Sequence, residues 1–274
     1  RRLLPEDTAA QGGDSLMRRP TMTRGALVAL TACALLLAGC GLQATDRKPR
    51  TTLFIGVDTS GSFEKSGHYD DSLRFLAHYI YGHLNRLGGL DQPKALFVAA
   101  IGGQDPNEPK AFHPIHDFEG KDVDQIERDL RKWYAPNDAL TDFNPFFEQV
   151  ARIVKDRNLI LAPITLMIVT DGVPDYSVPG AKPGSKQMYE GIDLTPLEYL
   201  SRRLTLRLAY VSPKVGASWR ELVPRRRVRL WTVDGEVMRG WKAQVRKNAD
   251  LARQEKLWSW IQDNVDYRVR SIGV

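Results

Sequence analysis

Cysteine is almost absent from this sequence of 274 residues, which contains Cys33 and Cys40 and no other. Both lie in the first forty residues, so no disulfide can staple the rest of the chain, and its stability must come from an apolar core. Histidine is scarce as well, and the five that are present show no convincing pattern of metal ligands. The chain also lacks internal repeats and long low-complexity stretches, while its hydrophobic fraction of 42% is ordinary for a globular protein.

The first forty residues have the pattern of an export signal. Arginines at positions 18, 19 and 24 precede the apolar run 26–39, which is too short to span a bilayer comfortably. The letters LAGC that end this region resemble the lipobox of bacterial lipoproteins. That resemblance implies that Cys40 is acylated and becomes the first mature residue, anchoring the protein to a membrane. The alternative is an ordinary signal peptide with a chance cysteine.

These features predict how the chain is divided. Translation is expected to begin at Met17 or Met22, so residues 1–16 would be an upstream over-extension of the reading frame. Residues 17–39 are then the lipoprotein signal peptide, and residues 40–50 are the lipidated cysteine and a tether. Ten extended residues reach at most about 35 Å, so the domain over residues 51–270 would lie close to its membrane.

Apolar strands and amphipathic helices alternate along this domain. Several of the strands are continuous apolar runs, which is typical of strands covered by helices on both faces. The pattern predicts an α/β fold with a Rossmann-like, doubly wound, mostly parallel sheet. The expected strands are 51–57, 94–102, 164–170, 205–211 and 225–233, and the expected helices are 69–87, 122–134, 144–156, 195–203, 218–223 and 251–269.

Two of these strands end in an acid, Asp58 in GVDTSGS and Asp171 in MIVTDG. Ser60 and Ser62 follow the first acid, and Thr141 stands just before a helix. Ligands of open α/β sheets bind beyond the carboxyl ends of the strands, so we expect these five side chains to converge if the two strands are neighbours. All are oxygen donors, a set that suits Mg²⁺, Mn²⁺ or Ca²⁺ rather than zinc.

The order Asp58-x-Ser60-x-Ser62, then Thr141, then Asp171 in TDG resembles the metal-ion-dependent adhesion site of von Willebrand factor type A (VWA) domains. The resemblance covers about residues 51–270. It implies that the two serines and the threonine coordinate the cation through hydroxyls, directly or through water. The two acids would hold it partly through ordered water, and a carboxylate from a protein partner would complete the octahedron.

The donor set favours adhesion over catalysis. Hydroxyl ligands neutralise little of a cation's charge, so the cation would attract an incoming carboxylate, and Mg²⁺ tends to keep an exchangeable position. Hydrolysis would need a positioned base, and the sequence offers Glu64 and His68 nearby without an obvious role. Two alternatives remain: a metal-dependent hydrolase, such as a phosphoesterase, that uses Asp58 and Asp171, and a scaffold lipoprotein that uses no metal.

Two further segments stand out. The arginines of RRRVRLW (225–231) suggest contact with anionic lipid, although a solvated strand edge is the plainer interpretation. The segment 172–191, rich in Pro, Gly and Lys, is either a partner-contacting loop or simply disordered. Because an exported protein seldom meets nucleic acid, the expected partners are a protein ligand and the membrane. With Gly41 after Cys40, the expected location is the outer membrane of a Gram-negative cell, facing the periplasm, or else the outer face of the cell membrane.

Overall fold

The computed structural model describes residues 49–103, 110–136, 138–176, 179–200, 204–247 and 249–266. The predicted signal, Cys40 and most of the tether lie outside this part of the chain, so they stay predictions. From Pro49 onward the chain forms one compact unit. Within the described residues, no helix is both long enough and apolar enough to cross a membrane.

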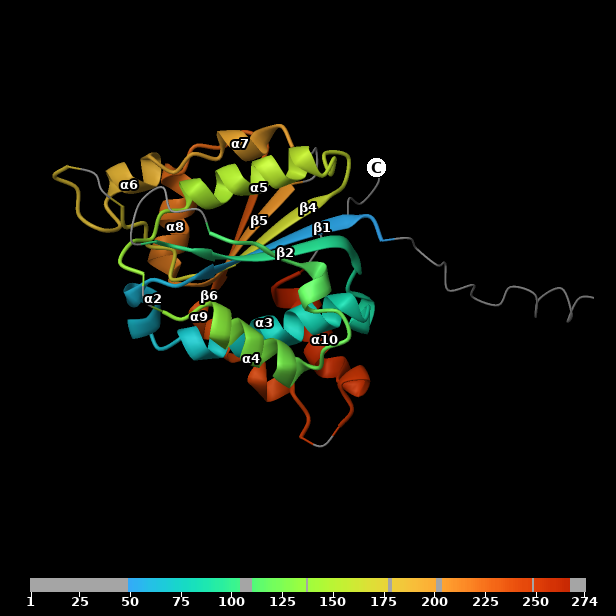
Figure 1. Ribbon diagram of the computed structural model, residues 1–274. Coiled ribbons are helices and arrows are strands. Elements are labelled where there is room, and N and C mark those ends of the chain that lie inside the picture. The colour runs from blue at the N-terminus through green and yellow to red at the C-terminus, as the bar shows by residue number, and fades with distance from the viewer. Residues whose placement is uncertain are drawn as a thin grey trace, which may run out of the picture. The chain divides into compact units, whose positions relative to one another are not determined.

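The centre of the unit is a six-stranded sheet with the order β3-β2-β1-β4-β5-β6 (Figure 1). All neighbouring strands pair in parallel except the short edge strand β3, which is antiparallel to β2. The predicted doubly wound sheet is therefore confirmed. The strands are β1 (Thr51–Asp58), β2 (Pro93–Ile101), β3 (His113–Pro114), β4 (Ile164–Val169), β5 (Leu204–Val211) and β6 (Arg229–Asp234).

Helices cover both faces of the sheet, and alternate residues of each strand enter different apolar clusters. In β1, for example, Ile55 packs into one cluster and Phe54 into the other. One face carries α3 (Tyr69–Leu84), α4 (Val123–Trp133), α9 (Gly235–Arg239) and α10 (Glu255–Asn264), and the other carries α5 (Asn144–Asp156), α6 (Lys186–Glu190), α7 (Thr195–Glu198) and α8 (Pro213–Leu222). Because both clusters lie in the unit that starts at Pro49, this unit carries its own core.

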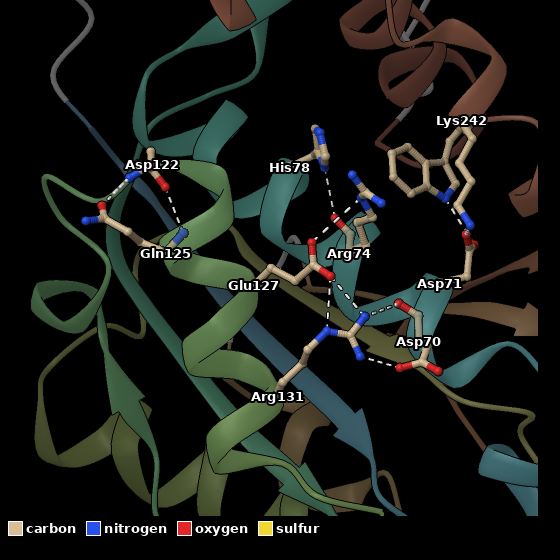
Figure 2. Close-up of polar contacts among 10 residues, drawn as sticks. Asp70, Asp71, Arg74, His78, Asp122, Gln125, Glu127, Arg131 and Lys242 are labelled. Carbon is tan, nitrogen blue, oxygen red and sulfur yellow. Dashed lines mark hydrogen bonds and ion pairs between the residues drawn. The ribbon is translucent and has the colours of Figure 1, made fainter. Parts of the chain in front are cut away.

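Charged residues join the helices of the first face. Figure 2 shows Arg131 of α4 between Glu127 of the same helix and Asp70 of α3. Asp122 caps the start of α4 by accepting a hydrogen bond of 2.7 Å from the Gln125 backbone N–H. Each acid at this α3–α4 contact therefore meets a cation or a backbone donor from the chain itself.

Several predicted elements have different bounds in the structure. Helix α8 begins at Pro213 because Ser212 caps it by accepting from the Val215 N–H, so it is longer than the predicted turn over 218–223. In contrast, α7 is a single turn, and residues 225–228 form a loop rather than the start of β6. In α10, Trp258 is as buried as its neighbours Leu257 and Ile261, whereas Trp260 is partly exposed.

Candidate metal centre

The strand order of the sheet reverses at β1, and this reversal positions the candidate site. Strand β1 pairs with β2 on one side and with β4 on the other, so the chain first builds the sheet to one side of β1 and then to the other. A crevice forms beyond the carboxyl ends of strands at such a switch point. Asp58 ends β1, and Asp171 follows β4 by two residues. The two strands that end in acids are neighbours, as the prediction required.

Asp58 is fully buried at the end of β1. Its Oδ1 accepts a hydrogen bond of 2.9 Å from the Ser60 backbone N–H, and its Oδ2 accepts one of 2.5 Å from the Thr170 hydroxyl. These bonds fix both carboxylate oxygens beside the crevice. Thr170 is a functional residue that the sequence pattern did not reveal, because it continues the apolar run of β4 directly before Asp171.

The two serines lie where the chain turns from β1 into the short helix α2 (Gly61–Lys65). Ser60 is the N-cap of this helix, and its Oγ accepts from the Phe63 N–H at 3.4 Å. The hydroxyl oxygens of Ser60 and Ser62 lie 3.1 Å apart. The Ser62 side chain also hydrogen-bonds Asp171, which links the loop after β1 to the loop after β4.

Asp171 is held by a tight turn. Its Oδ1 accepts a hydrogen bond of 2.9 Å from the Val173 N–H. Gly172 between them has φ +73°, and a Cβ at this position would lie 2.8 Å from a methyl group of Val215. Glycine is therefore required here both by the backbone conformation and by the close approach of α8.

Thr141 reaches the site on a loop that lies between the two strand ends. Asp138 of this loop exchanges backbone hydrogen bonds with Thr59 and Gly61, at 3.1 and 3.2 Å. Thr141 itself exchanges two with Asp175, at 2.7 and 3.0 Å. The Thr141 side chain is fully buried, and its hydroxyl has no hydrogen-bond partner among the described residues. A buried hydroxyl of this kind is costly unless a ligand satisfies it.

The site concentrates negative charge, and no cation of the described residues forms an ion pair with its two acids. Burial and the nearby charge of Asp171 raise the pKa of Asp58 to about 7. Burial also raises the pKa of Asp171, although hydrogen bonds from the Val173 N–H and the Ser62 side chain act against this. Neither acid forms an ion pair with any residue that the structure describes.

Asp138 and Asp142 have structural roles next to the site. The Thr59 hydroxyl donates to Asp138 at 2.5 Å, and Lys110 forms an ion pair with the same carboxylate at 3.4 Å. Asp142 accepts from the Asn144 N–H at 3.0 Å in the first turn of α5, and burial raises its pKa. Asp138 thus fixes the Thr141 loop to the end of β1, a role for which the sequence gives no signal.

The donor set fits a hard cation. It contains two carboxylates and three hydroxyls, and oxygen donors of this kind are the ligands of Mg²⁺, Mn²⁺ and Ca²⁺. The described residues contain no group of three or more His, Cys, Asp or Glu side chains that could hold a metal ion. A cation at this site would therefore depend on the hydroxyls of Ser60, Ser62 and Thr141 as well as on the acids.

The two residues considered as catalytic bases lie elsewhere. Glu64 is exposed on α2. His68 stacks against the ring of Tyr210, with ring centroids 5.5 Å apart. Among the hydrogen bonds of the described residues, none joins Glu64 or the imidazole of His68 to Asp58 or Asp171. The described residues therefore place neither of these two candidate bases in hydrogen-bond contact with the acids.

Comparisons with known proteins identify relatives of the fold. No family model and no curated protein matches the chain. Among solved structures, the pilus adhesin SpaC of Lactobacillus rhamnosus GG is 11% identical, with a TM-score of 0.48 over 80% of this chain and 31% of its own. The manganese-loaded TRAP protein of Plasmodium vivax is 18% identical, with a TM-score of 0.41 over 68% and 69%. The SpRpn10 VWA domain is 9% identical, with a TM-score of 0.38 over 68% and 89%.

The chain spans less than a third of SpaC, so the whole activity of that adhesin does not transfer to it. These TM-scores all lie below 0.5, so the fold is described from the chain's own coordinates, as a mostly parallel six-stranded sheet flanked by helices. At these identities the likeness concerns the fold alone, and the function has to be inferred from the residues of the site.

Proposed function

We propose that the protein is a binding domain that captures a protein ligand through a divalent cation, Mg²⁺ first and Mn²⁺ or Ca²⁺ as alternatives. Asp58, Ser60, Ser62, Thr141 and Asp171 would hold the cation. The observation that carries this proposal is the pair of neighbouring acids, the fully buried Asp58 and the partly buried Asp171, without an ion-pair partner among the described residues. A bound divalent ion would supply the missing positive charge and a ligand for the Thr141 hydroxyl.

A partner's carboxylate would complete the coordination. The three hydroxyls carry no charge and the two acids would hold the ion partly through water, so the ion would still attract a further carboxylate. Mg²⁺ is commonly bound by one or two carboxylates with positions left for water or substrate. A Glu or Asp of the ligand could take such a position. The chain's own contribution is to fix its donors rigidly: Ser60 as a helix cap, Asp58 through two hydrogen bonds and Asp171 through the Gly172 turn.

We further propose that the domain acts in the cell envelope, attached through lipid on Cys40. In a Gram-negative cell Gly41 favours the outer membrane, with the domain in the periplasm, and in other cells the domain would sit on the outer face of the cell membrane. The support for this proposal is the sequence pattern of residues 17–40. Nucleic acid is not an expected partner.

The test uses residues 49–274 and a Ser60→Ala/Ser62→Ala variant. We expect Mg²⁺ or Mn²⁺ to raise the melting temperature of the parent protein and not that of the variant. Envelope proteins captured on the immobilised parent should be released by a chelator and should not bind the variant. A Ser218→Ala variant, which changes a partly exposed serine of α8 away from the site, should behave like the parent.

Three results would contradict the proposal. Capture that persists in a chelator would favour a scaffold that uses no metal. Metal-dependent turnover of a generic phosphoester that Asp58→Asn abolishes would favour the hydrolase. Identical melting of the parent and the Ser60→Ala/Ser62→Ala variant at all metal concentrations would remove the assigned ligands.

A further inference from the structure

The amino ends of the parallel strands form the end of the sheet opposite the candidate metal centre. The register places the starts of β1, β2, β4, β5 and β6 at one edge, with Thr51 beside Pro93 and Thr52 beside Ile164. The loops that enter β4 and β6 therefore lie at this end, and so does the point where the chain enters β1 (Figure 1). Two features gathered here have no role in the metal centre.

The first feature is an apolar turn between α5 and β4. The Ala162 N–H donates to the Leu159 carbonyl at 3.1 Å, which leaves Ile160 and Leu161 at the tip of the turn. Leu161 is 99% exposed and Ile160 is 40% exposed. Turn tips are normally Gly, Pro, Asn, Asp or Ser, so turn formation does not explain two large apolar residues. The turn is also fixed in place, because the Thr52 N–H donates to the Pro163 carbonyl at 2.9 Å.

The second feature is the arginine loop that leads into β6. The Arg225 guanidinium donates to the Arg220 carbonyl at 2.8 Å and thereby caps α8. The backbone N–H groups of Arg226 and Arg227 both donate to the buried carboxylate of Glu198. With the backbone held in this way, the side chains of Arg226 and Arg227 are exposed, and the Arg227 guanidinium lies 5.8 Å from the ring of Tyr199.

Together these two features present exposed apolar side chains, an exposed tyrosine and arginines whose backbone is held in place. Tyr199 is 69% exposed next to Arg227, and Arg157 is exposed near the base of the apolar turn. Acids are present too, since Asp156 adjoins Arg157 and Glu198 lies beneath the arginine loop, but Glu198 is buried and occupied by backbone donors. We call Arg157, Ile160, Leu161, Tyr199, Arg226 and Arg227 the amino-end surface.

We infer that the amino-end surface docks onto an anionic lipid bilayer. Exposed apolar side chains can enter the headgroup region, tyrosine prefers the interface, and each arginine near an anionic surface adds attraction. The positive charge of the amino-end surface favours an anionic bilayer as its partner. The path of the chain also favours it, because residues 49 and 50, which follow the proposed lipid anchor, lead into β1 at this same end. Docking here would turn the carboxyl ends of the strands, with Asp58 and Asp171, away from the membrane.

The test is co-sedimentation of residues 49–274 with vesicles in the presence of EDTA, so that neither the predicted lipid nor a divalent cation contributes. One set of vesicles contains phosphatidylcholine alone, and the other contains equal parts of phosphatidylcholine and phosphatidylglycerol. We compare Arg226→Glu/Arg227→Glu and Ile160→Ser/Leu161→Ser with a matched charge change on α4, Arg128→Glu/Lys132→Glu. Both positions of this control are exposed, on a helix of the other face of the sheet.

We expect binding to the anionic vesicles only, with the partition coefficient reduced about tenfold or more in each amino-end variant and unchanged in the α4 control. The Ser60→Ala/Ser62→Ala variant should bind vesicles like the parent, which separates this inference from the metal proposal. Absence of binding, or equal losses in the arginine variant and the α4 control, would overturn it. If the Arg226→Glu/Arg227→Glu variant loses binding while Ile160→Ser/Leu161→Ser keeps it, the surface recognises polyanions such as acidic protein or nucleic acid, and the bilayer assignment is overturned.

Discussion

Two buried acidic sites at opposite ends of the sheet are balanced in different ways. Asp266, near the start of β1, forms a buried ion pair with Arg207 and accepts a hydrogen bond of 3.3 Å from the Tyr79 hydroxyl. Asp58, at the other end, receives hydrogen bonds from Ser60 and Thr170 and has Asp171 as its charged neighbour. The first acid is neutralised by the chain itself, whereas the second, within the part of the chain that the structure describes, meets uncharged donors and a like charge.

The difference indicates what each site is for. A buried carboxylate with its own guanidinium is complete once the protein has folded, so it contributes to structure. A buried carboxylate beside a second, partly buried carboxylate is unfavourable without a cation, and the arrangement becomes favourable when a divalent ion enters. Asp266 with Arg207 is thus a structural charge pair, whereas Asp58 with Asp171 is a candidate binding site. The following predictions test this distinction.

The largest effect is expected at the structural pair. Arg207→Met would leave Asp266 buried without its guanidinium, and we expect the free energy of unfolding to fall by about 3–5 kcal/mol. Urea denaturation monitored by tryptophan fluorescence measures this change. The double variant Arg207→Met/Asp266→Leu should recover part of the loss, because the unpaired charge is gone. Equal stability of the single variant and the parent would show that Asp266 does not need Arg207.

The metal-free protein should be less stable at pH 8 than at pH 5. Folding raises the pKa of Asp58 from 3.8 to about 7, so its contribution to stability is present at low pH and is lost as the pH rises toward the folded value. The full shift corresponds to about 4 kcal/mol, of which about 2.5 kcal/mol is lost between pH 5 and pH 8, with a change in the same direction from Asp171. Thermal melting in EDTA across this range measures it.

Added Mg²⁺ should reverse this pH dependence, since the cation binds the ionised carboxylates that are unfavourable without it. The rise in melting temperature on adding Mg²⁺ should therefore be larger at pH 8 than at pH 5. The Asp58→Asn variant is the control and should show little of either effect. A rise in melting temperature that is the same at both pH values would contradict the assignment of Asp58.

The same change from acid to amide should have opposite signs at the two sites. Asp58→Asn removes a buried charge while keeping an acceptor for the Ser60 N–H, so in EDTA at pH 8 we expect a gain of about 2 kcal/mol in the free energy of unfolding. Asp266→Asn removes the partner of Arg207 and should destabilise the protein. Urea denaturation of the two variants side by side checks both signs, and losses at both sites would refute the comparison.

The smallest changes in stability are expected for two buried threonines, Thr170 and Thr141. Thr170→Val removes the donor to Asp58 and should cost about 1–3 kcal/mol. Thr141→Val removes a buried hydroxyl without a described partner, so it should raise the free energy of unfolding of the metal-free protein by about 1 kcal/mol and weaken Mg²⁺ binding by about tenfold. Denaturation in EDTA and calorimetric titration with Mg²⁺ measure the two quantities.

Periodicity predicted most of the fold. The helix over 144–156 and the apolar strands have nearly the predicted bounds because each forms a single buried stripe or run. The predicted bounds were wrong where a single side chain sets the end of an element. The Ser212 cap starts α8 earlier than predicted, and the Glu198 carboxylate accepts from the backbone N–H groups of residues 226 and 227 and so holds them in a loop. Such contacts depend on residues far apart in the sequence or on single side chains, which periodicity does not reveal.

The sequence predicted the candidate ligands of the site but not the residues that hold those ligands in place. Asp58 and Asp171 are visible in the sequence because they interrupt apolar strands, and the structure confirms that these strands are neighbours. Thr170 and Asp138 were missed because their roles depend on partners over 70 residues away in the chain, 112 for the Thr170–Asp58 bond and 79 for the Thr59–Asp138 bond. The hydroxyl of Thr141 was expected at the site, whereas its lack of a partner emerges only from the structure.

The most direct test of the central claim is a crystal of residues 49–274 soaked in Mn²⁺ and measured for anomalous scattering. The account predicts a single strong manganese peak between the carboxyl ends of β1 and β4, within coordinating distance of the hydroxyls of Ser60, Ser62 and Thr141. A crystal of the Asp58→Asn variant should lose that peak. Manganese bound only by other residues, or a parent crystal without a peak at this position, would contradict the claim that the buried acids are balanced by a cation from outside the chain.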